Sequence, residues 1–193
     1  MTGTVLFSNN FASCETHRVL RPDGSVVDDW LIWQERDHIN AIVQRASDGK
    51  FLLFRQRKYA LDGPVLAPVG GLVEDGEPPL ATAKREVAEE AGLACAHWRP
   101  LGRAQGFPVA ANRFGGRGFY FLACGCRGDD AAAVAALAGS AGLDAEAQAK
   151  TWHTAAELRA RVLAGDLQEG KWTGAASLAL MTVADGSPGC AAG

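Results

Sequence analysis

The sequence predicts an α/β fold in which paired strands precede a strongly amphipathic helix. Two strand-turn-strand patterns occupy the first third of the chain, one clear helical pattern follows them, and a further strand and two helices come later. The chain has 193 residues, of which 48% are hydrophobic. That length suffices for one compact domain with its own core and is too short for two full domains.

The first hairpin is predicted over residues 17–36, where Pro22-Asp23-Gly24 separates a short strand from the aromatic and β-branched run 26–33. The other elements follow from the same periodicities. They are a hairpin of strands 39–45 and 51–57 joined through 47–49, a loop over 59–71, a strand over 119–126, a short strand over 151–153, and helices over 155–164 and 175–183. Residues 129–149, rich in alanine, are compatible with a loop or a weak helix.

The best-defined helix is predicted over Pro79–Ala91. Apolar side chains recur there at every third or fourth position, and Gly92 is placed to end the helix. At 100° per residue, Glu86, Glu89 and Glu90 share a wedge of about 100° on the side away from the apolar stripe. The helix therefore presents three carboxylates on one strip.

These carboxylates indicate a cation site. Like charges three or four residues apart destabilise a helix by about 0.2 to 0.5 kcal/mol per pair, so the strip favours a compensating cation. Hard divalent cations prefer oxygen ligands, and magnesium is the first candidate. Arg85, four residues before Glu89, is placed to hold that carboxylate by a charge-assisted hydrogen bond. Glu77 precedes the helix, where a negative charge is stabilised by the helix N-terminus.

The spacing of these residues adds a stronger signal. Gly71 is followed after five residues by Glu77 and then, after seven more, by the run Arg85-Glu86-Val87-Ala88-Glu89-Glu90-Ala91-Gly92-Leu93. This pattern matches the Nudix box in full, and the chain resembles the Nudix hydrolases from about residue 39 to 183. The resemblance implies an α/β/α sandwich around a mixed β-sheet, and hydrolysis of a diphosphate bond by an activated water with Mg²⁺, or Mn²⁺ in its place.

The resemblance also implies roles for individual residues. Glu86, Glu89 and Glu90 are the implied metal ligands, with the carbonyl of Gly70 in the same shell. The implied catalytic residues are Glu89, Glu90, Arg85 and Glu146. Glu146 is the match for a late catalytic glutamate of the family, and it is equally compatible with a solvated loop residue. In that second case a glutamate of the box would have to act as general base.

Within the family, the flanking sequence is most similar to the ADP-ribose and ADP-sugar pyrophosphatases. The similarity lies in the segment 55–59 before the box and in Pro108 after it, while 67–69 and 111–113 depart from the usual sequences of that group. The stretch 93–128 carries five arginines and no acid, which favours contacts with phosphates or a terminal sugar. The predicted substrate-binding residues are Arg55, Arg57, Lys58, Arg113 and Phe107. The candidates for stacking on a base are Trp30, Trp33, Phe107 and Phe114, each of which also suits a core position.

The leading functional prediction is hydrolysis of ADP-ribose or an ADP-sugar to AMP and a sugar phosphate. The first alternative is another substrate of the same family: a dinucleoside polyphosphate, a coenzyme, a nucleoside triphosphate or an RNA cap. The second is a non-catalytic module that senses a nucleotide. The intact box counts against this sensor, because a sensor has no need of every metal carboxylate.

The predicted organisation is a β extension over 1–36, a catalytic domain over 37–184 and a disordered tail over 185–193. The resembling group implies a homodimer formed through the extension. A net charge of −3 and a pI near 5.8 argue against broad capture of nucleic acid. The sequence shows no secretory signal or membrane span, so a cytoplasmic location is expected, with the five cysteines as reduced thiols. Cys124 and Cys126 are interpreted as strand packing rather than as metal ligands.

Overall fold

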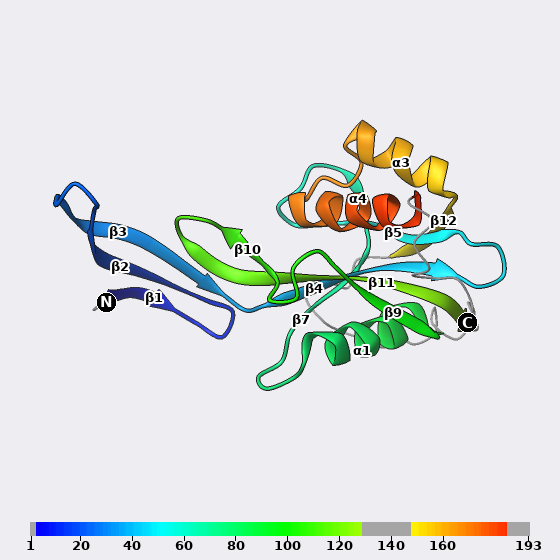
Figure 1. Cartoon of the computed structure of the whole chain (residues 1–193), viewed down its shortest axis with the longest axis horizontal. Helices are drawn as coiled ribbons and strands as arrows, with labels where there is room; N and C mark the ends of the chain where they lie inside the picture. Colours follow the sequence, from blue (N-terminus) through cyan, green and yellow to red (C-terminus); the bar gives the residue numbers. More distant parts are fainter. Residues whose placement is uncertain (1–2, 129–147, 185–193) are drawn as a thin grey trace.

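A mixed β-sheet forms the centre of the molecule in the computed structural model, which describes residues 3–128 and 148–184 (Figure 1). The strands are β1 Gly3–Ser8, β2 Ala12–Leu20, β3 Val26–Glu35, β4 His38–Arg45, β5 Phe51–Arg57, β6 Pro64–Ala67, β7 Val69–Leu72, β8 Leu93–Ala94, β9 His97–Leu101, β10 Phe107–Ala110, β11 Phe114–Gly128 and β12 Ala149–His153. The helices are α1 Pro79–Ala91, α3 Ala155–Ala164 and α4 Gly170–Ala184.

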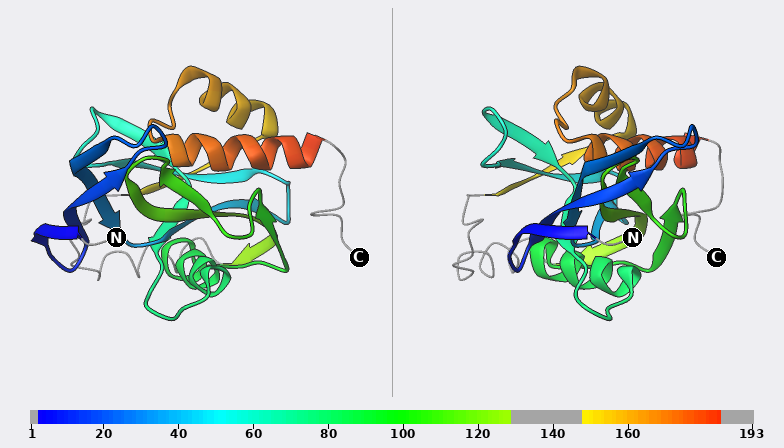
Figure 2. Two further views of the ribbon diagram at one scale, coloured as in Figure 1. Left: turned by 60° about the vertical axis from the view of Figure 1, so that its left-hand side comes forward. Right: turned by 90° about the vertical axis from the view of Figure 1, so that its left-hand side faces the viewer.

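The sheet has the order β1-β2-β3-β11-β4-β5-β12, and further short strands pair with β4, β5 and β11. Strand β11 runs parallel to β3 and β4, whereas the other described pairs are antiparallel. Helix α1 covers one face of the sheet, and α3 and α4 cover the other (Figures 1 and 2). The predicted α/β/α sandwich around a mixed sheet is thus confirmed.

Strand β4 lies between two apolar cores. Ala41 and Val43 face α1 and pack with Val87 and Ala91, while Ile42 faces the side of α3 and α4. All of these side chains are completely buried. Since successive side chains of a strand point to opposite faces, this short apolar run contributes to both layers of the sandwich.

The sheet opens between β4 and β5. These two strands pair at one position, Gln44 opposite Phe51. Beyond it, β4 pairs with β7 over residues 38–41, while β5 pairs with β6 over residues 54–57. The two pairs of strands therefore diverge and leave a gap in the middle of the sheet, with α1 on one side of it and α4 on the other.

Several predicted elements are confirmed: both hairpins, the strand within β11, the helix over 79–91 and the helix over 155–164. The loop predicted over 59–71 is wrong, because residues 64–67 form β6 and residues 69–72 form β7. The last helix begins at Gly170 rather than at residue 175. Glu146, most of the alanine-rich stretch and the tail from residue 185 lie outside the described residues. No helix among the described residues is long and apolar enough to cross a membrane.

The prediction of five reduced cysteines is also wrong. A disulfide joins Cys95 to Cys126, whereas Cys14 carries a free thiol. The two bonded residues are 31 positions apart in sequence. The antiparallel pairing of β8 with the end of β11 places them opposite each other, beside the pair of Ala94 and Arg127. Sequence spacing does not reveal such a pair, because the pairing depends on strand register.

Candidate active site

Helix α1 supplies the carboxylates of the candidate site. It begins at Pro79. Proline is favoured at the first helical position, because an N–H group there would have no hydrogen-bond partner within the helix. It ends at Gly92, whose φ of 62° gives the left-handed conformation that closes many helices. On the inner face of the helix, Val87 and Ala91 are completely buried. Its other face therefore carries the glutamates toward the gap in the sheet and toward solvent.

Arg85 gathers three of the nearby carboxylates. Its Nε and Nη2 donate to the two oxygens of Glu77 at 3.3 and 3.1 Å. Its Nη1 donates to Glu86 at 2.9 Å and to Glu89 at 3.2 Å, which confirms the predicted bond to Glu89. The hydroxyl of Thr82 donates to Glu77 at 2.7 Å. One guanidinium thus fixes the orientation of the acidic groups along the start and middle of α1.

The protonation of these groups follows from their surroundings. Hydrogen bonds from Arg85 and then from Thr82 hold the pKa of Glu77 below its ordinary value. Burial raises the pKa of Glu86, against the opposing effect of Arg85. The pKa of Arg85 is raised above its ordinary value, mainly by its hydrogen bond to Glu77. Glu86 is consequently a half-buried carboxylate whose charge Arg85 stabilises and which a bound metal cation would stabilise further.

The backbone of β7 forms a cradle for Glu86. A Cβ atom added at Gly71 would lie 2.2 Å from the Oε1 of Glu86, so only glycine leaves room for this carboxylate. The side chain of Glu86 is 14% exposed, whereas that of Glu89 is 60% exposed. Among the described residues, no three acidic, histidine or cysteine side chains are gathered closely enough to hold a metal by themselves. Carboxylates beside backbone carbonyls are nevertheless the oxygen donors that suit Mg²⁺.

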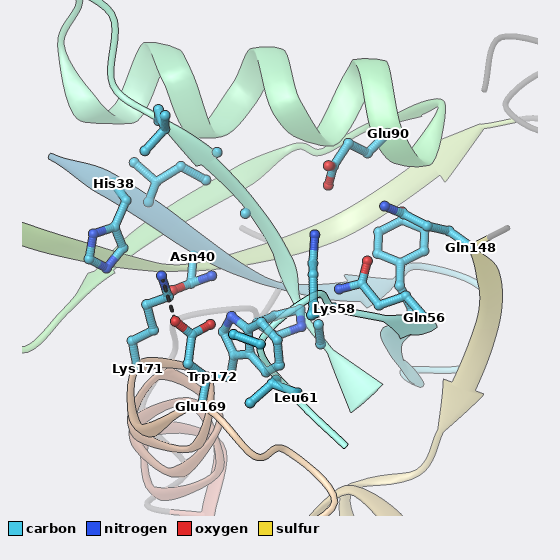
Figure 3. Close-up of a pocket in the computed structure, with 18 of the residues that line it drawn as sticks. His38, Asn40, Gln56, Lys58, Leu61, Glu90, Gln148, Glu169, Lys171 and Trp172 are labelled. Atoms are coloured by element: carbon cyan, nitrogen blue, oxygen red, sulfur yellow. Dashed lines mark ion pairs between the residues drawn. The ribbon is translucent and has the colours of Figure 1, made fainter. Parts of the chain in front are cut away.

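A cavity of about 470 Å³ occupies the gap in the sheet (Figure 3). Glu90 projects into it from α1, and Gly70 and Gly71 of β7 form part of its wall. Gln56 and Lys58 come from the end of β5, and the start of α4 closes the far end. The full lining is His38, Ile39, Asn40, Phe54, Gln56, Lys58, Tyr59, Ala60, Leu61, Ala67, Pro68, Gly70, Gly71, Leu72, Glu90, Gln148, Glu169, Lys171 and Trp172.

The far end of the cavity is polar. Lys171 and Glu169 form an ion pair there at 2.9 Å (Figure 3). His38 and Asn40, on β4, are 6% and 2% exposed. Within the described part of the chain, the Nε2 of His38 and the Oδ1 of Asn40 have no hydrogen-bond partner. Burial, with a smaller effect of Lys171, lowers the pKa of His38 to about 4, so its ring is neutral at pH 7.

Comparison with known proteins identifies the family. Residues 35–173, most of the chain, match the family profile of the NUDIX domain. The chain belongs to the Nudix family. It is a Nudix pyrophosphohydrolase, so α1 is the Nudix helix of this enzyme. A solved structure of an ADP compounds hydrolase is similar over 97% of this chain and 97% of its own, with 15% sequence identity and a TM-score of 0.71. No curated protein matches the sequence.

The Nudix cavity brings together some of the predicted site residues and not others. Gly70, Lys58 and Glu90 line it, and Glu86 contacts its wall at Gly71. Glu89 is exposed on the Nudix helix beside Arg85. The remaining predicted residues lie outside the cavity lining: Arg55, Arg57, Arg113 and Phe107. Strand alternation explains the first two, because Gln56 points into the cavity and its neighbours are exposed.

Two of the aromatic candidates for base stacking, Phe107 and Trp30, already have structural contacts. Phe107 stacks on Tyr120, with ring centroids 5.3 Å apart. The indole N–H of Trp30 donates to the carbonyl of Asn112 at 2.8 Å, which ties β3 to the loop that carries Arg113. Trp33 is 42% exposed, in the part of the sheet formed by β1, β2 and β3. These three residues lie outside the lining of the Nudix cavity.

Sequence reasoning missed the polar residues on the far wall. His38 and Asn40 alternate with apolar residues at the start of a buried strand, and that alternation of polar residues was their only sequence signal. Glu169 and Lys171 flank Gly170, the first residue of α4. The start of this helix was predicted at residue 175, five residues too late. Gln56 lies between Arg55 and Arg57, and the prediction assigned substrate binding to these two charged residues instead.

Proposed function

We propose that this Nudix enzyme hydrolyses ADP-ribose or an ADP-sugar, releasing AMP and a sugar phosphate. The observation that carries the proposal is one cavity that joins Glu90, on the Nudix helix, to a hydrogen-bonding wall formed by Asn40, Glu169 and Lys171. Its volume of about 470 Å³ lies within the range of small-molecule sites. A diphosphate at the glutamate end leaves space in the same cavity for a sugar.

The similarity to the ADP compounds hydrolase supports this choice of substrate. That protein has the same fold over 97% of both chains. The likeness concerns the fold, and the 15% identity leaves the side chains of the site free to differ. The substrate proposal therefore depends on the side chains of this chain as well as on the similarity.

We propose Mg²⁺ as the cofactor, with Mn²⁺ as a substitute, held by Glu86, Glu89, Glu90 and the carbonyl of Gly70. A bound divalent cation supplies charge neutralisation for the diphosphate and lowers the pKa of a coordinated water. Glu86 already lies against the backbone of β7, and Glu90 projects into the cavity.

Other residues of the chain orient the carboxylates or bind the substrate. Arg85 holds Glu77, Glu86 and Glu89 in place by its hydrogen bonds. Lys58 brings a positive charge to the cavity wall, where a substrate phosphate would be bound. The proton of the attacking water passes to a carboxylate of the box, Glu89 or Glu90, or to Glu146, which lies outside the described residues.

We also propose that residues 1–36 form a β extension through which two copies of the chain dimerise. Strand β1 is exposed along its whole length. Several large apolar side chains of this region are solvent-exposed in the single chain: Val5, Leu6, Phe7, Phe11, Leu20, Val26, Leu31 and Trp33. A concentration of exposed large apolar side chains in one region is typical of protein interfaces. Sedimentation analysis tests the dimer, which a charged substitution at Phe7 would dissociate and which a monomeric wild type would contradict.

Release of nucleoside monophosphate tests the function. The panel contains ADP-ribose, ADP-glucose, GDP-mannose, NADH, diadenosine polyphosphates and nucleoside triphosphates, each with Mg²⁺ or Mn²⁺. We expect turnover to prefer ADP-ribose or an ADP-sugar and to collapse in Glu90→Gln. Lys84→Gln, an exposed substitution on the same helix, is the matched control and keeps activity.

Other outcomes of this panel separate the alternatives. A preference for dinucleoside polyphosphates, coenzymes or triphosphates would overturn the substrate and leave the chemistry of the box intact. Nucleotide binding without metal-dependent turnover on any substrate would instead identify a sensor.

A further inference from the structure

The ion pair of Lys171 and Glu169 faces the end of the cavity remote from the middle of the Nudix helix. Both side chains line the cavity, and they are 34% and 39% exposed. Behind them, Asn40 and His38 are buried and each leaves one polar atom without a partner among the described residues. The proposed hydrolysis uses neither the ion pair nor these two buried side chains. The wall therefore holds more hydrogen-bonding capacity than the structure uses.

We propose that Glu169, Lys171 and Asn40 form a subsite that recognises the hydroxyl groups of the substrate's terminal sugar. This inference rests on the proposed function and adds the residues that select among diphosphate substrates. Glu169 accepts hydrogen bonds from sugar hydroxyls, and Lys171 donates to a hydroxyl or ring oxygen. Asn40 completes the wall with an amide that both donates and accepts.

The charges at this end suit hydroxyl groups better than phosphate. Lys171 is neutralised by Glu169 at 2.9 Å, and the carboxylate would repel a phosphate placed beside it. The ring of His38 is neutral at pH 7 and adds no positive charge. Hydroxyl groups are donors and acceptors at once, so they satisfy a carboxylate, an ammonium and an amide together.

The surroundings also suit a sugar better than a base. Trp172 lines the cavity but is only 5% exposed, so little of its ring is accessible for stacking. Tyr120, which packs against the core cluster that contains Trp172, is stacked on Phe107. A base needs an accessible aromatic face to stack on, and these two rings, one nearly buried and the other already stacked, offer little such surface. Glu169 and Lys171 lie across the cavity from Glu90 (Figure 3), so a substrate whose diphosphate is bound at Glu90 would extend its terminal sugar toward them.

Kinetics with two substrates test the subsite. ADP-ribose carries the terminal sugar, and the methyl ester of ADP carries the same diphosphate without it. In Glu169→Gln and in Lys171→Met, we expect the KM for ADP-ribose to rise by about tenfold or more, because a hydrogen bond to a charged group is lost. The KM for the methyl ester and the kcat for both substrates stay within about twofold of wild type.

Asp166→Asn is the matched control, since Asp166 forms an exposed ion pair with Arg161 outside the cavity. It should leave both KM values unchanged. Thermal unfolding of each variant checks that the fold is intact. Equal rises for the two substrates, or no rise for either, would overturn the subsite.

Calorimetric titration with Ca²⁺ in place of Mg²⁺ separates this inference from the proposed function. Wild type should bind ADP-ribose about tenfold more tightly than the methyl ester, and the preference should vanish in both variants. Equal binding of the two ligands by wild type overturns the subsite. If wild type binds ADP-ribose more tightly than the methyl ester but turns over neither, the subsite is supported and only the proposed function is overturned.

Discussion

Substitution of Gly71 by alanine should inactivate the enzyme with little loss of stability. The added Cβ would lie 2.2 Å from the Oε1 of Glu86, whereas ordinary contacts of a Cβ begin at 3.4 Å. The carboxylate must therefore move by about 1 Å, a displacement of the size that lowers rates by about 100-fold when a reacting group is misplaced. The obstructed atoms, Oε1, Cδ and Cγ, all belong to the side chain of Glu86 and not to the backbone, so the free energy of unfolding should change by about 1 kcal/mol or less.

Steady-state kinetics and urea unfolding of Gly71→Ala measure both quantities. Gly174→Ala is the matched control, because its added Cβ meets nothing closer than Tyr120 at 3.9 Å, an ordinary contact. We expect the control to keep its kcat within about twofold, and Gly71→Ala to lose about 100-fold. If Gly71→Ala keeps its kcat, the position of Glu86 against β7 is not the arrangement in which the enzyme works.

Three further predictions concern the groups around the cavity. Arg85→Lys keeps a positive charge but loses the fork that binds three carboxylates, so kcat should fall by about 10- to 100-fold at an unchanged Tm, measured by steady-state kinetics and circular dichroism. Lys150 donates to the carbonyl of Ala91, at the end of α1, at 2.8 Å. Lys150→Met should therefore lower the free energy of unfolding by about 1 to 2 kcal/mol in urea titrations and raise the Mg²⁺ concentration needed for half-maximal activity. His38 has a pKa lowered from 6.5 to about 4 by burial, so the unfolded chain binds an extra proton between these values. Stability should fall by about 1 to 2 kcal/mol as the pH falls from about 7.5 to about 5, and urea titrations of His38→Asn should lose this part of the pH dependence. An unchanged pH dependence in that variant would show that His38 is not buried as a neutral ring.

The Nudix helix was predictable because its signals are local. The apolar period, the proline at its start and the glycine at its end lie within one segment, and the observed bounds Pro79–Ala91 match the prediction. The bond from Arg85 to Glu89 was predictable for the same reason, since residues four apart on a helix are neighbours.

The opening of the sheet was not predictable in this way. Strands β6 and β7 have four residues each and contain proline or glycine, so their sequence suggested a loop. They become strands because β4 and β5 offer them unpaired edges. The disulfide between Cys95 and Cys126 likewise depends on the register of β8 against β11.

The pattern of residues along β4 and β5 nevertheless reflects where these strands separate. On one face of β4, Ile42 is packed in the core near the point of contact with β5, while Asn40 and His38 follow on the same face where β5 has left. On β5, Phe54 is followed two residues later by Gln56, again where the strands diverge. Buried polar side chains are costly unless they have partners. The unpartnered polar atoms of Asn40 and His38 are therefore best explained by a polar ligand in the gap, which β4 lines together with the start of α4.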